Sequence, residues 1–240
     1  MSGLNIKLYT LGGAFGMRSV SPFCLKLEML LKSLNLPYEL VIEPDPRKAP
    51  KGKMPYAVID GEVLADSEII VARLDELTQG GVTGKLTARE NGQGLALTRL
   101  AEEHLYWIMV AARWLDDAWW PNVVRDFFGI IPLPLRGIVT AMIRRKMRLT
   151  YEYQGLGLHS PAEQQGFARR DLQALQDAIS EAGFLLGEAP CIYDFAVAAI
   201  LAGIYDNQPP TFLTHIANEF TELKAYTDRV QESVDVYGRK

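Results

Sequence analysis

Residues 21–34 read SPFCLKLEMLLKSL, and this stretch decides how the first half of the chain folds. Ser21 is a good helix cap, and Pro22 suits the first helical turn because its missing N–H would have no partner there. From Phe23 to Leu34, apolar residues recur at helical spacing. The stretch therefore predicts a helix that begins after Ser21 and ends near Leu34.

Strand patterns lie on both sides of this predicted helix. Residues 6–10 alternate and are β-prone, and residues 38–42 form a second strand-like run. Two further runs, 56–59 and 62–64, flank Asp60-Gly61, a dipeptide typical of a two-residue hairpin turn. Asp66-Ser67 then caps a helix that runs to about Leu77. The order strand, helix, strand, loop, hairpin, helix predicts one small α/β domain over residues 1–78.

Beyond residue 84 the apolar residues follow a different spacing. Residues 79–84 are Gly-rich and are interpreted as a linker, after which strand patterns nearly vanish. Helical patterns cover residues 88–119 as one long helix, then 135–151, 162–182, 194–205 and 219–233. We therefore predict a second, all-helical domain over residues 86–240.

The composition is that of a folded, soluble protein. The chain has 240 residues, of which 48% are hydrophobic and 22% charged, and its net charge is −4, which argues against a nucleic-acid partner. Cys24 and Cys191 are too few and too far apart for a disulfide framework. The N-terminus lacks a signal-peptide pattern, and the most apolar stretch, 127–143, is interrupted by two prolines and an arginine. We expect a cytoplasmic protein with no integral membrane segment.

Three motifs resemble a known family. Ser21-Pro22-Phe23-Cys24 at a helix start is similar to the active-site turn of thioredoxin-fold proteins, and Met54-Pro55 before the hairpin is similar to the cis-proline of that fold. Asp66-Ser67 resembles the acidic-Ser pair with which glutathione transferases bind the glutamyl end of glutathione. The resemblance implies the glutathione transferase fold: a thioredoxin-like N-terminal domain that binds glutathione, an all-α C-terminal domain, and a homodimer.

Further runs resemble the Failed axon connections and metaxin-related branch of this family. The similarity touches roughly residues 4–205, and the runs that carry it are Ser21 to Glu28, Leu36 to Glu39, Glu102 to Tyr106 with Arg113-Trp114, and Gln154 to Gly157 before His159-Ser160-Pro161. The branch includes transferase-like, import and neuronal proteins, so this resemblance is only weak evidence for any particular substrate.

Five residues are predicted to hold glutathione. A cis Pro55 would present the Met54 backbone to the tripeptide as to an added strand. The Ser67 N–H and hydroxyl suit the γ-glutamyl carboxylate at a helix start, and Asp66 suits the amino group. Lys53, or Lys51 nearby, suits the glycyl carboxylate. The structural alternatives are a trans-proline, a plain helix cap and solvated lysines.

Ser21 is the predicted catalytic residue. Its hydroxyl can donate a hydrogen bond to the glutathione sulfur and lower the pKa of that thiol, with help from the helix dipole. The alternative is that Ser21 only caps the helix. Cys24 occupies the resolving position of a dithiol motif, but without a cysteine at position 21 it is interpreted as a packed core residue. Tyr9 should point to the face of the sheet opposite Thr10.

The loop between Leu11 and Val20 is longer than in common transferases. Its glycines at positions 12, 13 and 16 predict a mobile segment that repositions the activating group or forms a lid.

The long helix of the second half carries the predicted pocket for a second ligand. Aromatic residues with one arginine suit an apolar or aromatic electrophile, and the alternative is packing between the domains. The pocket residues are Tyr106, Trp107, Val110, Arg113 and Trp114.

Two other patterns in this half have structural interpretations. A basic cluster at Arg136, Arg144, Arg145, Lys146 and Arg148 reads as a solvated helix face, or else as a rim that attracts anionic ligands or a membrane surface. Asp194 is predicted to bond back to the Cys191 N–H at a helix start. The histidines show no metal-ligand spacing, so no metal is expected.

The motifs favour an enzyme that transfers glutathione to a hydrophobic or aromatic electrophile. A non-catalytic binding or scaffold protein of the same fold is the alternative. A glutathione-dependent thiol reductase is disfavoured, because it would need a cysteine at position 21.

Overall fold

The first half of the chain contains the only strands of two or more residues among residues 3–240, which are the residues that the computed structural model describes. Residues 1 and 2, the start of the predicted first domain, lie outside the described residues. The elements of this half are β1 (Ile6–Thr10), α1 (Pro22–Ser33), β2 (Glu39–Ile42), η1 (Pro46–Lys48), β3 (Tyr56–Ile59), β4 (Glu62–Ala65) and α2 (Ser67–Leu77).

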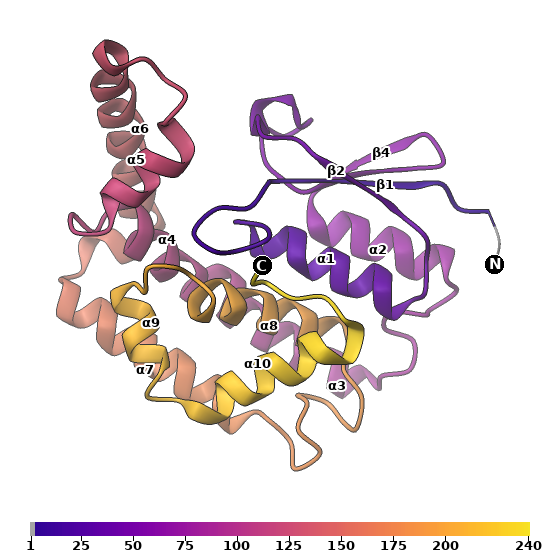
Figure 1. The fold of residues 1–240 in the computed structure, drawn as a ribbon. Coiled ribbons are helices and arrows are strands. Elements are labelled where there is room, and N and C mark those ends of the chain that lie inside the picture. The colour runs from indigo at the N-terminus through magenta and orange to yellow at the C-terminus, as the bar shows by residue number, and fades with distance from the viewer. Residues whose placement is uncertain (1–2) are drawn as a thin grey trace.

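The four strands form one mixed sheet with the order β2-β1-β3-β4. β1 runs parallel to β2 and antiparallel to β3, which forms the predicted hairpin with β4. α1 and α2 lie on one face of the sheet, between it and the helical half (Figure 1). Along β1 the buried residues alternate with half-buried ones, so Thr10 faces the helices and Tyr9 the other side, where it stacks on Tyr56. This is the predicted thioredoxin-like architecture.

The second half is helical, as predicted. Its elements are α3 (Ala88–Arg99), η2 (Leu100–Leu105, a π-helical segment), α4 (Tyr106–Trp114), α5 (Trp120–Phe128), α6 (Leu133–Gln154), η3 (Leu156–Leu158), α7 (Pro161–Asp177), α8 (Ile192–Tyr205), α9 (Phe212–Ala217) and α10 (Thr221–Val234). α8 lies at the centre of the molecule and packs against α1 and α10. All of its residues except Tyr193 are buried, which explains its continuous apolar sequence.

A buried carboxylate fixes the start of α8. Asp194 is fully buried, and its side chain accepts hydrogen bonds from the Cys191 N–H at 3.0 Å, the Leu185 N–H at 2.9 Å and the Tyr226 hydroxyl at 3.0 Å. The predicted bond from Asp194 back to position 191 is therefore confirmed.

The prediction of a single long helix over residues 88–119 is wrong in two respects. The observed helix widens into the π-helical segment η2 at Leu100–Leu105, and it ends at Trp114. The Asp116 side chain accepts from the backbone N–H groups of Ala118 and Trp119, at 2.8 and 3.1 Å, and so offers the backbone an alternative to helix.

Two helices were not predicted. α5 has a proline in its first turn, and α9 begins at a capping box formed by Thr211 and Thr214. Both signals stand in the sequence, but each helix is short, at nine and six residues, so periodicity alone is weak there.

The expectation of a mobile loop over residues 11–20 is corrected by the structure. Phe15 and Met17 in this loop are buried. The Arg18 N–H donates to the Gly238 carbonyl at 2.7 Å, and other backbone bonds join the loop to the segment after α10. The loop is therefore anchored to the helical half, because its two large apolar side chains gain more from burial than its glycines gain from freedom.

Across residues 3–240, no helix is both long enough and apolar enough to cross a membrane.

Candidate functional site

The strand register brings the three predicted glutathione motifs to one edge of the sheet. Tyr9 near the end of β1 lies opposite Tyr56 at the start of β3, and Tyr56 lies opposite Ala65 at the end of β4. The chain therefore leaves β1 toward Ser21, enters β3 from Pro55 and leaves β4 toward Asp66 at the same edge. Segments far apart in the sequence meet there because antiparallel neighbours alternate in direction.

The peptide bond between Met54 and Pro55 is cis, as predicted. Met54 and Pro55 are buried, and the Met54 side chain packs near Cys24 and Tyr9. Lys53 is exposed just before them, as is Lys51. The cis bond lies immediately before β3, so an extended peptide at this edge would continue the sheet.

Asp66 holds an unusual backbone conformation at the start of α2. Its φ is 107° and its ψ 134°, a region that residues with a side chain rarely adopt and that costs about 1–3 kcal/mol. Its carboxylate caps the helix by accepting from the Glu68 N–H at 2.9 Å. Ser67 is buried and Asp66 is exposed. Asp66 therefore caps the helix, and its strained backbone beside the free N–H groups of the helix start keeps it a candidate ligand-binding residue.

Ser21 stands before α1 as predicted, but its hydroxyl does not cap the helix. Ser21 is 7% exposed and Cys24 fully buried. Burial raises the pKa of the Cys24 thiol, while the hydroxyls of Ser21 and Thr10 lie close enough to hydrogen-bond it and oppose that rise. Cys24 is therefore a protonated, packed thiol at neutral pH, as the sequence suggested.

Ser19 is a further hydroxyl at this site, and it was not predicted. Its Oγ accepts from the Ser21 N–H at 3.3 Å, donates to the Leu11 carbonyl at 3.0 Å and lies 3.4 Å from the Thr10 hydroxyl. Three hydroxyls and one thiol thus gather where β1 ends and α1 begins. No sequence signal marked Ser19, because its place depends on how the loop 11–20 folds back.

The residues predicted to hold a second ligand separate into two aromatic groups. Tyr106 packs edge-to-face against Phe23 of α1, with ring centres 5.0 Å apart, and against Trp107 at 5.7 Å. Trp114 belongs to another group, stacked on Phe127 at 5.7 Å. Val110, between them on α4, is buried. The structure therefore places Tyr106 next to α1, and Trp114 next to α5.

Arg113 is buried, and its side chain connects the loop 11–20 to α8. Its guanidinium donates to the Gly203 carbonyl of α8, to the Val20 carbonyl at 3.4 Å and to the Met17 sulfur at 3.5 Å. Burial lowers its pKa to about 10, so it still carries its charge at neutral pH. Arg113 ties the loop 11–20 to the helical half, just behind Ser21.

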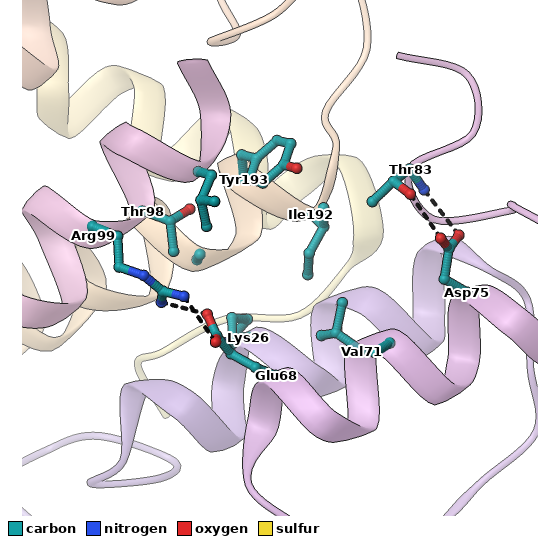
Figure 2. A pocket seen from close by; sticks show the side chains of 12 residues that line it. Lys26, Glu68, Val71, Asp75, Thr83, Thr98, Arg99, Ile192 and Tyr193 are labelled. Atoms are coloured by element: carbon teal, nitrogen blue, oxygen red, sulfur yellow. Dashed lines mark hydrogen bonds and ion pairs between the residues drawn. The ribbon is translucent and has the colours of Figure 1, made fainter. Parts of the chain in front are cut away.

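A cavity of about 300 Å³ lies between α2, α3 and α8, and Ser21 does not line it. Figure 2 shows the Arg99 guanidinium paired with Glu68 at one end of it, and Thr83 bonded to Asp75 at the other. Because Glu68 follows Ser67 directly, this cavity adjoins the predicted γ-glutamyl end of the site.

Among residues 3–240, three or more His, Cys, Asp or Glu side chains nowhere gather in a way that would hold a metal ion.

Two family models match the chain. The Glutathione S-transferase N-terminal domain matches residues 22–119, and the Glutathione S-transferase, C-terminal domain matches residues 168–230. Together they cover more than half of the chain and agree with the order of its two halves. The chain belongs to the glutathione S-transferase family.

Individual relatives extend this assignment. The isoprene-epoxide–glutathione S-transferase of Rhodococcus sp. (strain AD45) is 29% identical, in an alignment of 241 positions that covers 96% of this chain and 100% of that protein. Failed axon connections of Drosophila melanogaster is 27% identical over 216 residues, covering 83% of this chain and 50% of that protein. Metaxin-1 of Macaca fascicularis is 24% identical over 215 residues, covering 86% and 67%. The predicted similarity to the Failed axon connections and metaxin-related branch is confirmed, and the bacterial transferase was not expected.

Solved structures agree on the fold. A glutathione S-transferase from Methylobacillus flagellatus KT with glutathione bound superposes with a TM-score of 0.61 at 17% identity, covering 97% of this chain and 99% of that one. At this identity the likeness shows the fold alone.

Proposed function

We propose that this protein binds glutathione at the edge of the sheet where Ser21, Pro55 and Asp66 meet. The tripeptide pairs with the Met54 backbone beside cis Pro55. Its γ-glutamyl carboxylate lies at Ser67, its amino group at Asp66 and its glycyl carboxylate near Lys53. The observation that carries the proposal is the convergence of a cis peptide bond and a strained acidic helix start at one edge.

The proposed reaction is transfer of glutathione to a hydrophobic or aromatic electrophile. Ser21 donates a hydrogen bond to the glutathione thiolate, whose sulfur forms a bond to an electrophilic carbon. When the electrophile is an epoxide, as in the name of the Rhodococcus relative, the carbon–oxygen bond breaks and the alkoxide takes up a proton. The pocket residues are Tyr106, Trp107, Val110, Arg113 and Trp114. A homodimer, implied by the resemblance, and a cytoplasmic location, expected from the sequence, are part of this proposal.

A non-catalytic binding or scaffold protein is the second candidate. Ser21 is almost completely covered, and Arg113 donates to backbone carbonyls, so neither is freely available to a ligand. The similarity to Failed axon connections and metaxin-1 also favours this candidate. A thiol reductase has less support, because Cys24 is buried and burial raises its pKa.

Thermal unfolding with and without glutathione tests the first step. A ligand that binds only the native state stabilises it by about 2.7 kcal/mol at 100 times its dissociation constant. For an assumed constant of about 0.1 mM, this corresponds to roughly 10 mM glutathione, which should raise the melting temperature by several degrees. Oxidised glutathione and the tripeptide Ala-Cys-Gly, which lacks the γ-glutamyl link, are the matched controls. Turnover with an aliphatic epoxide and an aromatic halide then separates a transferase from a scaffold that binds glutathione only. A melting temperature that does not move would reject glutathione binding.

A further inference from the structure

The turn between α5 and α6 carries an exposed apolar tip. α5 and α6 project together away from the rest of the helical half (Figure 1). Ile130 in the turn is 91% exposed, and Leu133 at the start of α6 is 77% exposed. Single exposed apolar residues are ordinary, but a contiguous exposed group marks an interaction surface.

The exposed group continues along one face of α6. Leu135, Ile138, Met142 and Leu149 recur at helical spacing and are all exposed, with Ile138 at 62% and Met142 at 67%. The opposite face holds the buried residues of this helix, Thr140 and Tyr151. α6 is therefore apolar on its solvent side over several turns.

Basic residues accompany this surface along α6. The sequence from residue 127 to residue 151 contains five basic residues and no acidic one, although the whole chain has a net charge of −4. Arg136 and Arg144 are used internally: they donate to the backbone carbonyls of residues 129 and 131, and of residues 114 and 115. Arg145, Lys146 and Arg148 are exposed. These three cations lie a little over three turns along α6 from Leu133, close to Met142 and Leu149 in the sequence.

The combination indicates which partner fits. A second copy of this chain, packed face to face through the same surface, would bring the two sets of cations together and be repelled. An anionic bilayer is complementary to both features, because apolar side chains enter its headgroup and acyl boundary while Lys and Arg lie at the lipid phosphates. Since Trp114, Trp120 and Phe128 form an aromatic group at the base of the tip, the protein also offers residue types that favour this boundary.

We propose that the α5–α6 tip docks this protein on the surface of an anionic lipid bilayer. Ile130, Leu133 and Ile138 enter the headgroup region, and Arg145, Lys146 and Arg148 contact the phosphates. The contact is peripheral, and it is independent of glutathione chemistry, because none of these residues belongs to the proposed glutathione site.

Vesicle co-sedimentation of the full chain tests this inference. The protein should sediment with vesicles that contain about 30% phosphatidylserine in phosphatidylcholine, and not with pure phosphatidylcholine. At about 1 kcal/mol for each cation near such a surface, Arg145→Gln/Lys146→Gln/Arg148→Gln should weaken binding roughly a hundredfold. The matched control, Lys32→Gln/Lys85→Gln/Arg89→Gln, changes the net charge equally at exposed cations of α1 and around the start of α3, and should leave binding nearly unchanged.

A second pair of variants tests the apolar part. Ile130→Ser/Leu133→Ser should weaken binding more than tenfold, since each buried side chain of this size contributes about 1.5–3 kcal/mol. Val63→Ser/Ile69→Ser, at exposed apolar positions of β4 and α2, is the control. Circular dichroism and the melting temperature verify that all variants fold. Equal sedimentation of the parent with neutral and anionic vesicles, or equal loss in the control variants, would overturn the proposal. So would light scattering that shows a dimer dissociated by Ile130→Ser/Leu133→Ser while vesicles are ignored, because this face would then join two copies.

Discussion

Lys26 Nζ on α1 lies 2.7 Å from Glu102 Oε1 on η2, and both side chains are only 4% exposed. This buried ion pair joins the sheet-bearing half to the helical half. Burial raises the pKa of Glu102, and the charge and hydrogen bond of Lys26 act against that rise. The exposed pair of Arg99 with Glu68 lies beside it, so two salt bridges cross this contact. Lys26 and Glu102 both come from runs that resemble the Failed axon connections and metaxin-related branch, and the structure shows that these runs meet.

Lys26→Met should destabilise the protein by about 3–5 kcal/mol, because it leaves the Glu102 carboxylate buried without a partner. Lys26→Met/Glu102→Leu should recover most of that loss, since two apolar side chains can replace a buried ion pair at little cost. Urea unfolding of the parent, both single variants and the double variant gives the coupling energy. If the single and double variants were equally unstable, the pair would not be coupled.

The cost of Lys26→Met should also depend on pH. A carboxyl whose pKa is raised in the folded state stabilises the fold fully below its unfolded value of 4.5 and loses that contribution as pH rises through the folded value. Removing Lys26 raises the folded pKa of Glu102 further. The variant should therefore lie closer to the parent in stability near pH 4.5 than at pH 8. Unfolding curves at both values test this, and Lys32→Met, an exposed lysine of the same helix, should show no such dependence.

Asp66→Gly should weaken glutathione binding without lowering stability, because it removes the proposed contact to the amino group. Glycine adopts a φ of 107° freely, which offsets the lost cap and the greater freedom of the unfolded chain, so the net change should lie within about 1 kcal/mol. Titration calorimetry measures the affinity, and thermal unfolding the stability. Asp66→Asn is the control that keeps a capping acceptor and removes only the charge. Full affinity in the glycine variant would mean that Asp66 acts as a cap alone.

Ser21→Ala should slow glutathione transfer at neutral pH roughly ten- to hundredfold. The loss of one hydrogen bond to a charged sulfur costs about 1.5–3 kcal/mol and raises the pKa of bound glutathione, so the thiolate fraction falls. The pH–rate profile should shift to higher pH, while glutathione affinity changes less. Cys24→Ala is the comparison and should cost only some packing. An unmoved profile in Ser21→Ala, with turnover abolished in Cys24→Ala, would reverse the assignment.

Cys191→Ser should stabilise the protein by about 0.5–1 kcal/mol, because serine is a better helix cap than cysteine. The Cys191 sulfur lies 3.2 Å from the Asp194 carboxylate, and burial raises the pKa of this thiol to about 12, so no reactive thiolate is lost. Asp194→Asn is the opposing variant. It should destabilise by several kcal/mol, since an amide cannot serve all three of the donors that the carboxylate accepts. A drop in melting temperature for Cys191→Ser would contradict the capping argument.

Local sequence signals predicted much of the fold. Pro22 in the first turn of α1, the turn at Asp60-Gly61 and the cap at Asp66 each act within a few residues of themselves. They located α1, the β3–β4 hairpin and α2 to within a residue or two. Asp116 is the counterexample, because its side chain ends a helix whose apolar pattern continues past it. Periodicity records which face is buried and does not record where a polar side chain competes with the helix for backbone bonds.

The sequence by itself determined the fold, the family and the order of the three glutathione motifs, because caps, turns and apolar periods are local properties. Only the tertiary structure decided how the surroundings of Ser21 are built. Glycines in the loop 11–20 predicted freedom, yet Phe15 and Met17 anchor it, and Arg113 lies behind it as a buried contact. These outcomes depend on apolar burial and on desolvation of a charge between segments nearly a hundred residues apart. Such energies belong to the packed arrangement, and no window along the chain contains them.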